Sequence, residues 1–88
     1  MRVMTDNREL YDYLVSLALE LKIHGAISLS EAVDFASGQA SSSSTEFVGE
    51  SRIALRKVMD EENGILSARQ RSDLTDVLSQ IDAIFNNH

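Results

Sequence analysis

A pattern that ends one helix and starts the next occurs twice in this chain, at residues 25–31 and 64–70. Each copy opens with a glycine, which readily adopts the left-handed backbone conformation that closes many helices. A serine follows at the fourth position and a glutamate or glutamine at the seventh, which is the spacing of a capping box. Because both the end of a helix and the start of the next are specified within seven residues, the pattern predicts two tight helical corners.

Apolar residues at helical spacing predict four helices, over about residues 6–24, 29–37, 44–62 and 68–86. The chain has no proline to interrupt them. Residues 38–43 are rich in serine and lack periodicity, so we expect a mobile loop there. A third capping box, formed by Ser43 and Glu46, would start the helix that follows this loop. The 88 residues therefore predict one all-α domain, a small four-helix bundle of two αα-hairpins whose second helix is short.

Few side chains that perform chemistry are present in this sequence. It has no cysteine and only two histidines, and it contains neither a P-loop nor a Gly-x-Gly-x-x-Gly motif. His24 lies in the last turn of a predicted helix, where an imidazolium interacts favourably with the helix dipole. We therefore expect no catalytic residue, no cofactor, no metal site and no enzymatic activity. Without a signal-like start or a stretch of about 20 apolar residues, a cytoplasmic, non-membrane protein is expected.

Acidic residues outnumber basic ones by fourteen to eight, a net charge of −6 that repels phosphate backbones and anionic lipids. One alternative function, nucleic-acid binding, is disfavoured by this negative charge but suggested by another feature. Two helices joined at a glycine-containing corner are similar to a helix-turn-helix, which makes a nucleic-acid binder a second alternative function. The basic residues that would serve it lie in the second half of the chain, interleaved with acids: Arg52, Arg56, Lys57, Arg69 and Arg71.

Three consecutive carboxylates, Asp60, Glu61 and Glu62, fall at the predicted C-terminal end of the third helix, where the negative pole of the dipole disfavours them. Two explanations are open. Arg56 and Lys57, four residues upstream, could neutralise them, helped by Arg69 and Arg71 across the corner. Alternatively the acids form a patch that receives a basic partner protein, and this candidate binding surface comprises Glu46, Glu50, Ile53, Asp60, Glu61 and Glu62.

Apolar residues cover roughly 240° of the first helix, more than one neighbouring hairpin can bury. Either this helix is central in the bundle, or Val15, Leu19 and Ile23 face a second protein chain. The sequence thus favours a non-enzymatic acidic module that docks on a basic surface of another protein, as an antitoxin, an immunity protein or an adaptor would. A homo-oligomerising helical module, with a possible homodimer through those three residues, is the first alternative.

Overall fold

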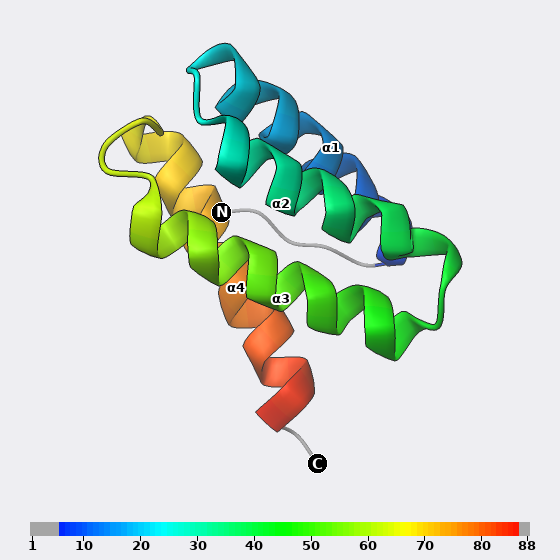
Figure 1. Ribbon diagram of the computed structural model, residues 1–88. Helices are drawn as coiled ribbons and strands as arrows, with labels where there is room; N and C mark the ends of the chain where they lie inside the picture. The colour runs from blue at the N-terminus through cyan, green and yellow to red at the C-terminus, as the bar shows by residue number, and fades with distance from the viewer. Residues whose placement is uncertain (1–5, 87–88) are drawn as a thin grey trace.

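The computed structural model describes residues 6–86, and four α-helices account for most of them (Figure 1). They are α1 (Asn7–Ile23), α2 (Ile27–Ser37), α3 (Ser44–Glu61) and α4 (Ala68–Asn86). A short 3-10 helix, η1 (Gly38–Ser41), continues from α2, so the predicted loop at 38–43 is partly ordered into a turn. No strand occurs between residues 6 and 86. The predicted all-α, four-helix class is confirmed.

Figure 1 shows α1, α2 and α3 side by side with alternating directions, while α4 crosses behind α3 in that view. The core lies between these layers, because every helix contributes apolar side chains that solvent does not reach. Largest among the fully buried side chains are Phe47, Leu14, Leu21, Leu55, Leu74 and Ile81. These residues belong to the stripes that periodicity predicts for α1, α3 and α4, which explains why the helices could be located from the sequence.

Side chains cap the starts of α1 and α3, and the Ser43 cap of α3 is the one that the sequence predicts. The backbone N–H of Glu9 donates to the carboxylate of Asp6 at 2.9 Å, and the N–H of Glu46 donates to Ser43 Oγ at 3.2 Å. At the other end of α1, Gly25 has φ +82°. The amides of Gly25 and Ala26 donate back to the carbonyls of Lys22 and Leu21, at 3.0 and 2.9 Å. This paired arrangement is a Schellman motif, so the first corner ends α1 in the expected way.

The start of α2 differs from the prediction. The helix begins at Ile27 rather than at residue 29, with Ala26 as its N-cap and no side-chain capping bond. The reason is that the carbonyl of Ala26 already accepts from the N–H of Ser30 at 2.9 Å, so helical hydrogen bonding is under way before Ser28. Ser28 consequently lies within the first turn, with an exposed side chain, and does not cap the helix.

Four aliphatic side chains on α1 and α4 are exposed to solvent although their helices pack in the bundle. Val15, Leu19 and Ile23 of α1 are 43 %, 59 % and 69 % exposed, so α1 is not enclosed by its neighbours and the interpretation as a central helix is wrong for this face. On α4, Ile84 lies three residues after the buried Ile81 but is itself 55 % exposed. α4 crosses the bundle steeply (Figure 1), which carries its last turns beyond the other helices.

Candidate functional site

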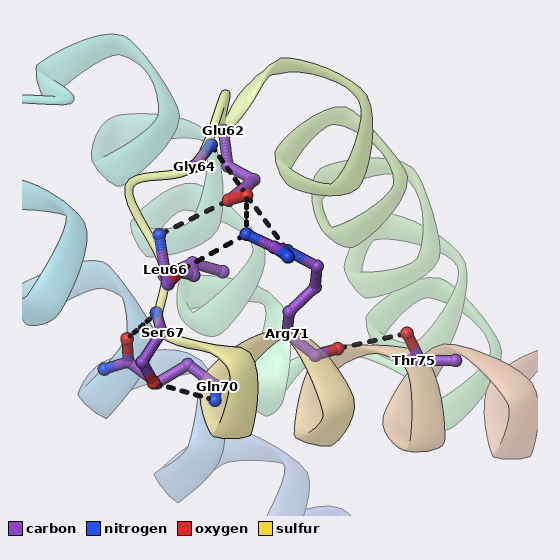
Figure 2. Close-up of polar contacts among 7 residues, drawn as sticks. All are labelled: Glu62, Gly64, Leu66, Ser67, Gln70, Arg71 and Thr75. Atoms are coloured by element: carbon purple, nitrogen blue, oxygen red, sulfur yellow. Dashed lines mark hydrogen bonds and ion pairs between the residues drawn. The ribbon is translucent and has the colours of Figure 1, made fainter.

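The second helical corner, between α3 and α4, is built around the side chain of Glu62 (Figure 2). Its carboxylate accepts hydrogen bonds from the backbone N–H of Gly64 at 2.9 Å and of Leu66 at 3.3 Å. Arg71, from the first turns of α4, places its guanidinium 3.2 Å from the same carboxylate. Only 7 % of the Glu62 side chain is exposed. The carboxylate therefore joins the end of one helix, the connecting loop and the start of the next.

The capping box predicted at this corner is confirmed. Ser67 Oγ accepts from the N–H of Gln70 at 3.1 Å, and the side-chain oxygen of Gln70 accepts from the N–H of Ser67 at 2.8 Å (Figure 2). Gly64 has φ +85° and the preceding Asn63 has φ +50°, so two successive residues adopt the left-handed conformation. Together with Glu62, these contacts fix the backbone through the whole turn.

Opposing effects act on the pKa of Glu62. Burial raises it, but the amides of Gly64 and Leu66 and the guanidinium of Arg71 together outweigh burial and lower the pKa below its ordinary value. The group is thus held as a carboxylate by partners within its own chain. Among the three consecutive acids, Glu62 must be removed from the candidate binding surface, because its charge is enclosed and already paired.

A second cluster of charges joins α3 to α4. Asp82 accepts from Arg52 Nε at 2.8 Å and from Arg56 at 3.2 Å, and the Arg52 guanidinium lies 5.0 Å from the centre of the Phe85 ring. Burial acts to raise the pKa of Asp82, but both arginines outweigh it, and the pKa is lowered. Asp82 faces α3, because α4 crosses beside the two arginines.

These two clusters bear on the first explanation for the acidic run, neutralisation by nearby cations. Arg71 does fold back across the corner, as one explanation required, but its partner is Glu62. Arg56 is bound to Asp82 instead of neutralising Asp60. No ion pair of Asp60 or Glu61 is found within residues 6–86. The same pairing engages three of the five cations considered for nucleic-acid binding, Arg52, Arg56 and Arg71.

The outward side of α3 is the first candidate surface. Glu46, Ile53 and Asp60 are spaced by seven residues, which places them in one line along the helix at intervals of about 10 Å. Glu46 and Asp60 are exposed, and Ile53 between them is 65 % exposed. Glu61 is exposed and Glu50 half-buried. We call these five residues, Glu46, Glu50, Ile53, Asp60 and Glu61, the α3 acidic face.

A groove between α1 and α2 is the second candidate surface. It has a volume of about 450 Å³, and its apolar lining comes mainly from Val15, Leu19 and Ile27. Lys22, Glu31 and Asp34 also line it, with Ala18 and Ser30. We call this surface the α1–α2 groove. Sequence reasoning identified Val15 and Leu19 but missed the α2 residues, because only the pairing of the two helices brings them to the same place.

Neither a metal-binding cluster nor a membrane-spanning helix occurs in the described part of the chain. Residues 6–86 contain no group of three or more His, Asp or Glu side chains that could hold a metal ion. None of the helices in this part has the length and apolar character needed to cross a bilayer. Comparison of the chain with known protein families, with curated proteins and with solved structures found no match.

Proposed function

We propose that this protein is a non-enzymatic binding module that docks on a basic surface of another protein through its α3 acidic face. The observation that carries this proposal is the exposed Ile53 between the two carboxylates of Glu46 and Asp60, a short apolar anchor inside a line of negative charge. An apolar anchor supplies affinity when it is buried, and the surrounding charges select and steer an oppositely charged partner.

Internal ion pairing supports this choice of surface. Arg52 and Arg56 lie on α3 itself, yet both bind Asp82 on α4, whose carboxylate offsets one of their two positive charges. Lys57 is then the remaining cation on α3, against four acids of the acidic face. A basic partner would therefore meet a predominantly negative helix face, whereas a phosphate backbone would be repelled by it.

The proposal is tested by capturing partners from the native cells on immobilised full-length protein and measuring the Kd of each purified candidate. Binding should weaken as NaCl is raised, because screened charges attract less. The variant E46Q/D60N removes the two flanking carboxylates and should raise Kd by on the order of tenfold at low salt, and Ile53→Ala should weaken binding at all salt concentrations.

A matched control removes the same charge elsewhere. D12N/E31Q neutralises two exposed acids of α1 and α2 and should leave Kd within about twofold of the wild type. Capture of no partner contradicts the proposal. So does a partner whose affinity is insensitive to salt and equally insensitive to both double variants.

A further inference from the structure

The α1–α2 groove has opposite charges at its two ends. Ser30 Oγ donates to the carbonyl of Ala18 at 2.7 Å, and this buried hydrogen bond fixes how the two antiparallel helices lie against each other. Lys22 follows Ala18 by four residues, toward the first corner. Asp34 follows Ser30 by four residues, in the opposite direction. Each lies about 6 Å along its helix from the Ala18–Ser30 contact, so one end of the groove is positive and the other negative.

Between these ends the groove is apolar and unusually exposed. Val15 and Leu19 line it from α1, and Ile27, 48 % exposed, lines it from α2. Ile23 extends the same exposed line of α1 by one more turn. Single exposed aliphatic residues are common on protein surfaces, but four gathered around one helical hairpin form a contiguous patch of the kind that binds another protein.

We propose that a second copy of this chain occupies the α1–α2 groove, related to the first by a two-fold axis that turns the groove end for end. Such an axis places Lys22 of each copy beside Asp34 of the other and brings the apolar middle of one groove against that of its partner. Glu31, next to Ser30 in the sequence, also lines the groove, and its side chain is exposed to solvent.

Charge complementarity selects a second copy over other occupants. A uniformly basic helix would be repelled by Lys22 at one end, and a uniformly acidic one by Asp34 at the other. The groove has a positive charge, Lys22, at one end and a negative charge, Asp34, at the other. A second copy rotated end for end therefore presents the opposite charge at each end. The α3 acidic face contributes nothing to this groove, and the dimer therefore neither requires nor excludes the partner proposed above.

The first test is the oligomeric state of the full chain, measured by sedimentation equilibrium from micromolar to millimolar concentrations. A reversible monomer–dimer equilibrium is expected. Leu19→Glu should give a monomer at every concentration, because two carboxylates would be buried near the two-fold axis. Ile84→Glu is the matched control, an aliphatic residue of similar exposure on α4, and should leave the equilibrium unchanged. Circular dichroism melting establishes that both variants are folded.

The second test addresses the end-for-end register. Lys22→Glu and Asp34→Lys should each raise the dimer Kd by on the order of tenfold, since each turns two symmetric attractions into repulsions. The double variant K22E/D34K restores both pairs and should return Kd to within about threefold of the wild type. A chain that remains monomeric at millimolar concentration overturns the proposal, as does a dimer that Leu19→Glu leaves intact or a double variant that fails to restore affinity.

Discussion

At the scale of single residues, Glu62 shows why an acid can end a helix that its charge should destabilise. The last turn of α3 and the loop after it leave backbone groups without helical partners, and the Glu62 carboxylate accepts from two loop amides, those of Gly64 and Leu66. Asp60 and Glu61 lie on other sides of the helix and stay in solvent. The sequence contains three adjacent acids, but it cannot show which of them faces the corner.

Replacement of Glu62 tests this assignment. Glu62→Gln keeps the size of the side chain but exchanges one acceptor oxygen for an NH₂ group, which would face a backbone N–H or Arg71. We expect the free energy of unfolding to fall by about 1–3 kcal/mol, the usual cost of an unsatisfied buried hydrogen-bonding group. Glu61→Gln, one position earlier and exposed, should change it by less than about 0.5 kcal/mol. Urea denaturation measures both, and equal shifts would contradict the structural role of Glu62.

The lowered pKa of Glu62 adds a pH dependence of known sign. Its unfolded pKa is near the ordinary value of 4.5, and its folded pKa is lower. Above the unfolded pKa the carboxylate contributes fully to stability, and this contribution is lost as pH falls through the folded pKa. The difference in unfolding free energy between wild type and Glu62→Gln should thus be constant above about pH 6 and shrink below 4.5. Asp82 is present in both proteins, so the difference in unfolding free energy between them reports on Glu62 alone. A difference that grows as the pH falls would contradict the structural role of Glu62.

At the scale of elements, one sequence pattern gives two different corners. At the first, Ala26 both completes the Schellman motif and starts α2, so only three residues separate α1 from α2 and Ser28 is already helical. At the second, six residues separate α3 from α4, and Ser67 caps the new helix. Periodicity and glycine positions located the four helices. The start of α2 was misplaced because the N–H of Ser30 already donates to the carbonyl of Ala26, while Ser30 Oγ donates to the carbonyl of Ala18 in α1, a tertiary contact that periodicity does not show.

The two serines of the repeated pattern should therefore differ in their contribution to stability. Ser67→Ala removes a capping acceptor and should lower the free energy of unfolding by about 1 kcal/mol. Ser28→Ala removes an exposed hydroxyl from inside a helix and should change it by less than about 0.5 kcal/mol, with a small gain from helix propensity. Thermal and urea unfolding of the two variants measure this difference. A Ser28→Ala loss as large as that of Ser67→Ala would restore the symmetric interpretation of the pattern.

At the scale of the whole molecule, the distribution of charge matters more than its sum. The formal net charge is −6, but Arg52, Arg56 and Arg71 are committed to ion pairs between α3, the second corner and α4. Part of the positive charge therefore stabilises the contacts of α4 with α3 and with the second corner, and each of these pairs also uses an acid, Asp82 or Glu62. No sequence pattern predicts this, because Arg52 and Asp82 are 30 residues apart and meet only through the crossing of two helices.

Self-repulsion among the exposed acids should make the protein more stable in moderate salt. The molecule measures 36 × 25 × 19 Å. At 0.01 M salt the Debye length is about 30 Å, so acids on all faces repel one another, whereas at 0.15 M it is about 8 Å and only close neighbours interact. The Tm should rise between these conditions, since unfolding relieves the repulsion. The variant D60N/E61Q removes two acids from the negative pole of α3. Its Tm at low salt should be higher than that of the wild type, and its Tm should rise less when salt is added. A Tm that falls with added NaCl would mean that the internal pairs of Glu62 and Asp82 outweigh the surface repulsion.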